Sequence, residues 1–170
     1  KRIYGEGKTV GIFQVEGKGM TEALKQIKPK NLEELSAVLA LYRPGPVKLI
    51  PNYVKRKYGK EPIEYLHPLL EPILSVTYGI LVYQEQLMRI ATDLAGFTLG
   101  EADVLRKAVG KKKVDLLQSL KTKLIEGMVK NGISENLAQK IWDWIEPFGQ
   151  YGFNKSHSIS YSYVSYITAY

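Results

Sequence analysis

The sequence predicts a mainly α-helical domain with little or no β-structure. Apolar residues recur every three or four positions along most of the chain, which is the period of an amphipathic helix. Asparagine, threonine or serine stands where several of these segments begin, and glycine or proline stands where most of them end. With 170 residues, 45% of them hydrophobic, and no cysteine, we expect a domain that folds around its own core without disulfides.

The first half of the chain predicts four helices. The apolar period covers four stretches: 20–27, 32–42, 50–59 and 69–74. Asn31, followed by Glu34 three residues later, forms a cap-like start for the second of them. The turn Arg43-Pro44-Gly45-Pro46 then ends that helix, because proline fixes φ and carries no backbone N–H.

The second half predicts a longer series of helices. The period continues through five stretches: 80–96, 98–110, 117–132, 134–147 and 159–170. Thr98 and Glu101 form a capping box, and Gly96 and Gly110 are expected to end the first two of these helices.

Two short stretches carry a hint of strand. Residues 10–13 are apolar, and residues 159–163 alternate with serine at a period of two. The second stretch also fits one helical face through Tyr163, Tyr166 and Ile167, and we favour a helix there.

Positive charge is concentrated in one part of the chain. The protein has 24 Lys and Arg against 17 Asp and Glu, a net charge of +7. Between residues 106 and 123, seven basic residues accompany one acidic residue. Such a stretch attracts polyanions, whereas the alternative is a solvated helix face whose lysines complement helix dipoles.

Conventional catalytic motifs are absent from the sequence. Gly7-Lys8-Thr9 has Arg2 where a phosphate-binding Walker loop needs a glycine. Glu101 and Asp103 stand two residues apart, so on a helix they point to different faces and do not share a metal. Lys155-Ser156-His157 lacks the nucleophile elbow of serine hydrolases.

The ends and the hydropathy of the chain suggest its context. No apolar run approaches the roughly 20 residues that span a bilayer, and no signal peptide opens the chain, so we expect a cytoplasmic protein with no membrane partner. The chain starts without methionine and stops inside a periodic segment. We therefore expect a piece of a larger protein.

Five motifs occur in order along the chain. They are Gly11-Ile12-Phe13-Gln14-Val15-Glu16 with Gly19-Met20, Ala40-Leu41-Tyr42-Arg43-Pro44-Gly45-Pro46, Thr77-Tyr78-Gly79-Ile80-Leu81-Val82-Tyr83-Gln84-Glu85-Gln86, Leu99-Gly100-Glu101-Ala102-Asp103 and Gly152-Phe153-Asn154-Lys155-Ser156-His157. Together they resemble the fingers region of the bacterial C-family replicative DNA polymerases, the α subunits of DNA polymerase III. The resemblance implies that residues 1–9 lead in from a missing palm and that 10–170 form an irregular multi-helix fingers domain, truncated at its C-terminus.

This resemblance implies a domain that binds the incoming dNTP and the template for nucleotidyl transfer. The catalytic carboxylates of that family lie in the palm in an Asp-x-Asp pattern, and no such pattern occurs here. Mg²⁺ is thus implied for the intact enzyme, with ligands outside this chain, and we expect the isolated chain to bind none and to be inactive. The implied partners are primer-template DNA, the dNTP, the palm and C-terminal domains of the same polymerase, and replisome subunits through other domains.

The resemblance also assigns site residues. Arg106 and Lys107 stand where the family usually has two arginines, and they are expected to meet the triphosphate, Arg106 with two donors and Lys107 as a point charge. Further dNTP contacts are expected from Tyr151, Asn154, Lys155 and His157, with His157 near the 2′ position of the sugar. The expected nucleic-acid contacts are Arg43, Lys111, Lys112 and Lys113. Gly149 and Gly152 are expected to let the backbone lie close to a ligand.

Other interpretations stay open for several of these residues. Lys155 could lie in solvent, Phe153 in the core, and the ring of His157 could cap the following helix. The turn at Arg43 could serve only to end a helix. One of the three polar residues at 84–86 is expected to face the site and the others water. Aromatic residues favour core or inter-domain packing over base stacking at five positions: Trp142, Trp144, Tyr161, Tyr163 and Tyr166.

Two functions from other classes also stay open. The first is a non-catalytic helical nucleic-acid-binding module, for which the basic stretch suffices. The second is a helical interaction protein whose lysines keep it soluble. The salt dependence of DNA binding separates them, because only a phosphate-contacting protein loses affinity steeply with salt.

Overall fold

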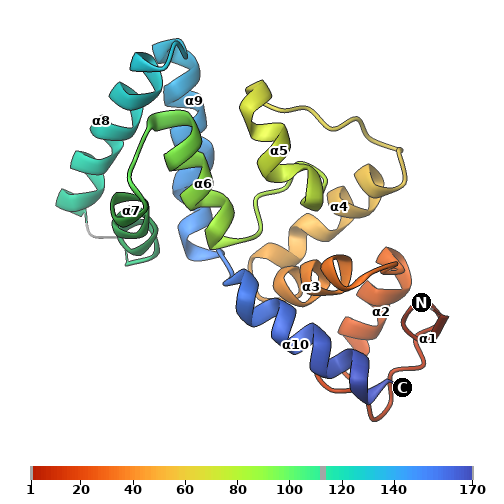
Figure 1. Cartoon of the computed structure of the whole chain (residues 1–170). Helices are drawn as coiled ribbons and strands as arrows, with labels where there is room; N and C mark the ends of the chain where they lie inside the picture. The colour runs from red at the N-terminus through yellow and green to blue at the C-terminus, as the bar shows by residue number, and fades with distance from the viewer. Residues whose placement is uncertain (1, 112–113, 170) are drawn as a thin grey trace. The chain divides into compact units, whose positions relative to one another are not determined.

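A computed structural model describes residues 2–111 and 114–169 of the chain. Within these residues the chain forms ten α-helices and four short 3₁₀ helices, with no strand beyond isolated bridge residues (Figure 1). The mainly α-helical class predicted from the sequence is confirmed. None of the helices in the described ranges has the length and apolar character that a membrane span needs.

The chain divides into two compact units, and each is described by itself. Unit 1 comprises Lys1–Ile63, Val76–Val82 and Phe153–Tyr170, and unit 2 comprises Glu64–Ser75 and Tyr83–Gly152. The helices of unit 1 are α1 (Arg2–Glu6), α2 (Lys18–Ile27), α3 (Leu32–Leu41), η1 (Pro46–Leu49), α4 (Ile50–Lys57) and α10 (Lys155–Thr168). The helices of unit 2 are η2 (Pro68–Leu70), α5 (Glu71–Leu74), α6 (Gln84–Ala95), α7 (Leu99–Lys111), α8 (Val114–Lys130), α9 (Glu135–Ile145) and η4 (Glu146–Gln150), while η3 (Ser75–Thr77) lies at the division.

In unit 1, helix α10 packs against α3 through small side chains. Ser158, Ser162 and Ser165 are fully buried on α10, and Ala37 and Ala40 are buried on α3. Small residues let two helix backbones approach closely, and the buried hydroxyls remain hydrogen-bonded. Ser158 Oγ, for example, donates to the Ser36 carbonyl at 2.7 Å.

The helix predicted for residues 159–170 is therefore confirmed, but its buried side is the serine side. Tyr163, Tyr166 and Ile167 are exposed on unit 1, so these residues are not part of its core. The packing of Tyr163 and Tyr166 against another domain stays a prediction. The apolar period misled because serine satisfies its hydroxyl on its own helix, as Ser162 Oγ does by donating to the Ser158 carbonyl at 2.8 Å.

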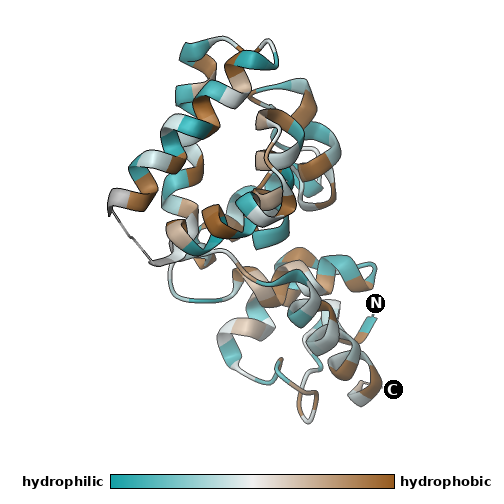
Figure 2. Cartoon of the chain, turned by 60° about the vertical axis from the view of Figure 1, so that its left-hand side comes forward, coloured by the Kyte–Doolittle hydropathy of each residue, from teal (hydrophilic) through white to brown (hydrophobic). Residues whose placement is uncertain are grey.

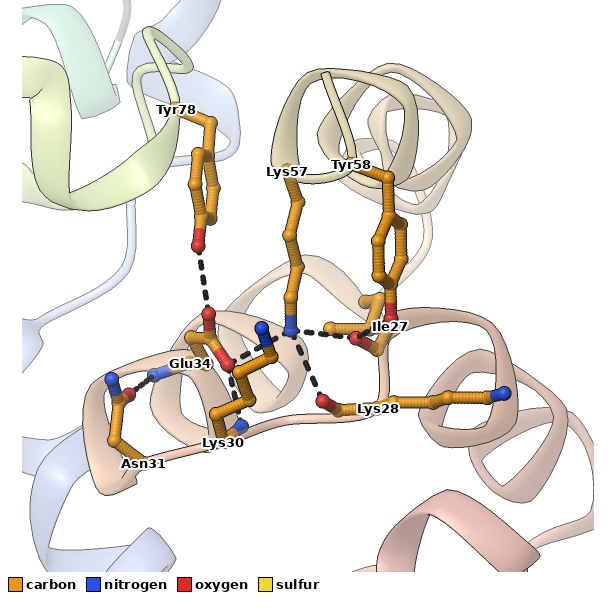
Figure 3. A network of polar contacts seen from close by, with 8 residues as sticks. All are labelled: Ile27, Lys28, Lys30, Asn31, Glu34, Lys57, Tyr58 and Tyr78. Atoms are coloured by element: carbon orange, nitrogen blue, oxygen red, sulfur yellow. Dashed lines mark hydrogen bonds and ion pairs between the residues drawn. The ribbon is translucent and has the colours of Figure 1, made fainter. Parts of the chain in front are cut away.

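A buried charged network joins the ends of three helices in unit 1 (Figure 3). Lys57 Nζ, at the end of α4, lies 2.8 Å from Glu34 Oε2 on α3. The same ammonium donates to the carbonyls of Ile27 at 2.7 Å and Lys28 at 3.1 Å, where α2 ends. Tyr78 OH donates to the other Glu34 oxygen at 2.7 Å.

Glu34 is ionised within this network. Burial by itself would raise the pKa of Glu34, but the hydrogen bonds from Lys57, the Lys30 backbone N–H and Tyr78 outweigh it and lower that pKa. The pKa of Tyr78 is raised, first by burial and then by its bond to the carboxylate. The Asn31 cap predicted for α3 is confirmed, since Asn31 Oδ1 accepts from the Glu34 backbone N–H at 2.8 Å.

In unit 2, helices α6 to α9 enclose an apolar core. Its largest fully buried side chains include Leu87, Ile90, Leu94, Leu105, Leu124 and Trp142. Figure 2 shows apolar and polar residues alternating along the helices, as amphipathic packing requires. The Thr98 and Glu101 capping box at the start of α7 is confirmed, because Thr98 N donates to Glu101 Oε2 at 2.8 Å and Glu101 N donates to Thr98 Oγ1 at 3.3 Å.

Three boundary predictions need correction. Helix α6 begins at Gln84 rather than near residue 80, since the Tyr83 N–H donates to Gln86 Oε1 at 2.9 Å and is satisfied before the helix starts. Helix α7 runs through Gly110 to Lys111 and is not ended by that glycine. Residues 10–13 form turns rather than a strand.

Candidate functional site

The turn that leads into α10 fixes three of the predicted residues. Asn154 caps the helix, with its Oδ1 accepting from the His157 backbone N–H at 2.8 Å, so the alternative in which the His157 ring is the cap is wrong. Phe153 N donates to the Val82 carbonyl at 3.1 Å and anchors the turn. Lys155 Nζ lies 3.3 Å from Glu33 Oε1 in a partly exposed ion pair.

A pocket of about 310 Å³ lies beside this turn in unit 1. It is lined by Gln14, Gly17, Met20, Leu39, Tyr42, Arg43, Phe153, His157, Ser158 and Tyr161. The His157 ring lies between two aromatic rings, with centroid distances of 4.1 Å to Tyr161 and 5.7 Å to Phe153. Two residues predicted separately, Arg43 and His157, are thus brought to one pocket.

Arg43 is the cation of this pocket. Its guanidinium lies over the Phe153 ring, 4.3 Å from the centroid, and its Nε donates to the Ala40 carbonyl at 2.8 Å. Burial lowers the pKa of Arg43 from its usual value, yet arginine is protonated far above neutral pH and keeps its charge. The pocket therefore combines flat aromatic faces with one oriented positive charge, a combination suited to a base or sugar next to a phosphate.

In unit 2, Asp103 on α7 contacts both Arg106 and Lys107, the two residues that the family resemblance assigns to the triphosphate. Asp103 Oδ1 accepts from Arg106 Nε at 2.9 Å and from Arg106 Nη2 at 2.7 Å. Asp103 Oδ2 lies 2.6 Å from Lys107 Nζ. The hydrogen bond from Lys107, followed by those from Arg106, lowers the pKa of Asp103, so this carboxylate is ionised at neutral pH.

Gln84 connects this group to the turn that ends η4. Its Oε1 accepts from Arg106 Nη1 at 3.1 Å, and its Nε2 donates to the Gly152 carbonyl at 3.4 Å. Gln86 faces neither the site nor water, because it is buried and its Nε2 donates to the Ile73 carbonyl at 3.2 Å. Gln84 is therefore one residue of positions 84–86 that contacts a predicted site residue.

The two glycines of this turn make room for neighbouring protein atoms. A Cβ on Gly149 would lie 2.5 Å from the carbonyl oxygen of Val109, so η4 packs directly on the backbone of α7. A Cβ on Gly152 would lie 2.9 Å from the Phe148 ring and 3.2 Å from Gln84 Cγ. Tyr151 stands between them, with its backbone N–H donating to the Phe148 carbonyl at 2.8 Å.

The basic stretch from 106 to 123 is partly neutralised by neighbouring carboxylates. Lys123 on α8 pairs with Glu101 on α7, and this bond, followed by those from Thr98, lowers the pKa of Glu101 to about 2. Lys112 and Lys113 lie outside the described residues, and of Lys111 only the backbone, at the end of α7, is described. Their DNA contacts stay predictions.

The predicted dNTP residues belong to both units. Arg106, Lys107 and Tyr151 are in unit 2, and Asn154, Lys155 and His157 are in unit 1. Sequence reasoning missed Asp103 as a partner, although its spacing of three and four residues from Arg106 and Lys107 on a helix was a usable signal. It had no signal for the Gln84 contact, which joins residues 22 apart.

Comparisons with known proteins agree on one family. Residues 1–132 match the family described as the bacterial DNA polymerase III alpha subunit finger domain. The chain is similar to proteins named DNA polymerase III subunit alpha from Aquifex aeolicus (56% identity), Chlamydia pneumoniae (53%) and Thermus aquaticus (46%), in each case over 99% of this chain. It spans only 14–15% of the length of these relatives. The chain thus belongs to the family of bacterial DNA polymerase III alpha subunit finger domains.

Proposed function

We propose that the chain contacts the incoming dNTP and the template within a template-directed DNA polymerase. The observation that carries this proposal is the guanidinium of Arg106, which is oriented from two sides by Asp103 and Gln84 and is not buried by them. Nucleotidyl transfer develops negative charge on the phosphate oxygens, and cations held in place before the reaction stabilise that charge.

The hydrogen bonds of Arg106 are consistent with this role. Arginine has five N–H donors, and among the described residues three of them, on Nε, Nη1 and Nη2, have protein acceptors. Nη1 and Nη2 each keep a second N–H, so two donors remain for phosphate oxygens. Lys107, whose side chain is 57% exposed, adds a second positive charge one residue along.

The pocket of unit 1 fits the nucleoside part of such a ligand. The rings of Phe153, His157 and Tyr161 offer flat faces, and Arg43 offers a cation. We propose that His157 lies near the 2′ position of the sugar and that Arg43 contacts the template or the nucleotide.

A metal ion does not fit the described residues. Among residues 2–111 and 114–169, no three His, Asp or Glu side chains gather in a way that could hold one. We propose that Mg²⁺, which neutralises triphosphate charge in this type of reaction, is held by carboxylates of the polymerase outside this chain. We expect the 170-residue chain by itself not to extend a primer, and template-directed incorporation by the purified chain would contradict this assignment.

The test of the proposal is the substitution Arg106→Ala in the intact polymerase that contains this chain. Arg106 would act on charge common to all nucleotides, so single-turnover incorporation of all four dNTPs should lose about 2 to 4 kcal/mol of transition-state stabilisation. Arg89→Ala is the matched control, because Arg89 pairs with Asp93 on the exposed side of α6. Unchanged incorporation by Arg106→Ala would overturn the proposal.

A further inference from the structure

Asp103, Gln84, Arg106 and Lys107 form a cluster in unit 2, here called the Asp103 cluster. Two helices supply it, α7 with the carboxylate and both cations and α6 with the amide of Gln84. Both oxygens of Asp103 are used, one by the side edge of the guanidinium and the other by the ammonium. Neither Asp103 nor Gln84 is a cation, and both contact Arg106 directly.

We infer that Asp103 and Gln84 are positioning residues that fix the plane and the direction of the Arg106 guanidinium before a triphosphate arrives. This inference rests on the proposed role of Arg106. Rotation about the last bonds of the arginine side chain would break the bond from Nε or from Nη2 to Asp103, or the bond from Nη1 to Gln84. The two remaining N–H groups therefore keep one orientation, which lowers the entropy lost when they meet a phosphate.

The support for the Asp103 cluster distinguishes it from an ordinary surface ion pair. An isolated pair within one helix contributes little, because both side chains remain free to rotate in water. Here Gln84 is itself held by the Gly152 carbonyl at 3.4 Å. Because Gly149 has no side chain, η4 packs directly on the α7 backbone at Val109. The partners of Arg106 thus stand on packed elements, as a preorganised site requires.

Electrostatics and positioning predict opposite signs for the loss of Asp103. The carboxylate adds one negative charge to the field around Arg106 and Lys107, so a purely electrostatic role means that its removal tightens triphosphate binding. A positioning role means that Asp103→Ala weakens incorporation in spite of the more positive field. Asp103→Asn separates the two further, because its amide oxygen still accepts from Nε and Nη2 of Arg106 while the charge is gone.

The experiment uses the intact polymerase that contains this chain and measures single-turnover incorporation against dNTP concentration. We expect Asp103→Ala to lower kcat/KM for all four dNTPs by about ten- to a hundredfold, Gln84→Ala to lower it less, and Asp103→Asn to retain most of it. In the Arg106→Ala background, Asp103→Ala should have no further effect, because a positioning residue acts only through the residue it positions. Asp93→Ala is the matched control, since Asp93 forms the same type of pair with Arg89 on α6.

The outcomes separate this inference from the proposed function. Suppose that Arg106→Ala loses incorporation. The positioning role alone is then overturned if Asp103→Ala tightens dNTP binding, or if adding Asp103→Ala to Arg106→Ala causes an equal further loss of incorporation. Absence of any loss in Arg106→Ala overturns the proposed function and the inference with it. Circular dichroism melting shows whether each variant is folded. If Asp103→Ala does not fold, the single variants Asp103→Asn and Gln84→Ala test the inference in its place.

Discussion

Glu34 in unit 1 and Asp103 in unit 2 are carboxylates that each contact basic side chains, but in different environments. In unit 1 the side chains of Glu34 and Lys57 are 8% and 2% exposed. In unit 2 the side chains of Asp103 and Arg106 are 34% and 26% exposed, and that of Lys107 is 57% exposed. A carboxylate paired with basic side chains is therefore buried between helices in unit 1 and partly exposed to solvent in unit 2.

The two clusters also differ in how many N–H donors of their cations are used by protein acceptors. Lys57 directs its ammonium at three acceptors, the carbonyls of Ile27 and Lys28 and the carboxylate of Glu34, which accounts for all three N–H groups of a lysine. Arg106 keeps two donors beyond its protein partners in the described part of the chain. Removing one partner from a nearly buried cluster with every donor used is costly to the fold, whereas a cluster with spare donors and exposure is suited to a ligand.

The largest expected effect is on the buried network. Lys57→Ala should lower the free energy of unfolding of unit 1 by about 3 to 5 kcal/mol, because it leaves the Glu34 carboxylate buried without its cation. Urea unfolding of the chain, followed by circular dichroism, measures this. Lys55→Ala, which removes an exposed lysine from the same helix, is the control and should change little. A Lys57→Ala chain as stable as the control would show that the network is not a structural joint.

The second expected effect is the pH dependence of that network. The pKa of Glu34 is lowered in the folded state, so its ionised form stabilises the fold at pH values above the usual glutamate pKa, and this stabilisation is lost as pH falls through the folded-state pKa. The unfolding free energies of wild type and Glu34→Gln should therefore converge between about pH 7 and pH 3. A constant difference between the two over that range would mean that the charge of Glu34 contributes nothing.

Local rules predicted most of the fold. The caps at Asn31 and Thr98 depend on residues three positions apart, and the structure has both. The serine face of α10 could not be predicted by hydropathy, since its burial depends on the small residues of α3, more than 100 positions away. The Glu34 network was missed for the same reason, because Lys57 and Tyr78 reach Glu34 across 23 and 44 positions.

The sequence identified residues of the candidate site but not the residues that they contact. Family motifs pointed to Arg106 and His157, while the contacts of both, with Asp103 and Gln84 for one and with Phe153 and Tyr161 for the other, came from the structure. The glycines of the turn were assigned to a ligand because glycine marks any close approach of backbone. The sequence does not tell whether the approaching group is a ligand or, as at Gly149, another helix.

The third prediction concerns sugar selection by the pocket of unit 1. If His157 lies near the 2′ position, His157→Ala in the intact polymerase should change the ratio of dNTP to rNTP incorporation, by about tenfold, since selectivity is a difference of two binding free energies. Single-turnover incorporation of both sugars measures the ratio. Tyr163→Ala is a suitable control, because Tyr163 is exposed on α10 and does not line this pocket. Equal losses for both sugars would leave His157 as a residue that only packs between Phe153 and Tyr161.

The smallest expected effect tests the basic stretch. Lys123 is already paired with Glu101, so we expect DNA contact to depend more on Lys111, Lys112 and Lys113. The chain should bind primed DNA weakly, and replacing these three lysines by glutamine should flatten the plot of log K against log salt by about 0.9 for each duplex phosphate contact that is lost. Lys123→Gln should change the slope less, because its ammonium is shared with a carboxylate. An unchanged slope in the triple variant would place the DNA contact elsewhere. If a dNTP competes for binding to the chain less well than inorganic phosphate does, a non-catalytic nucleic-acid-binding module would be favoured.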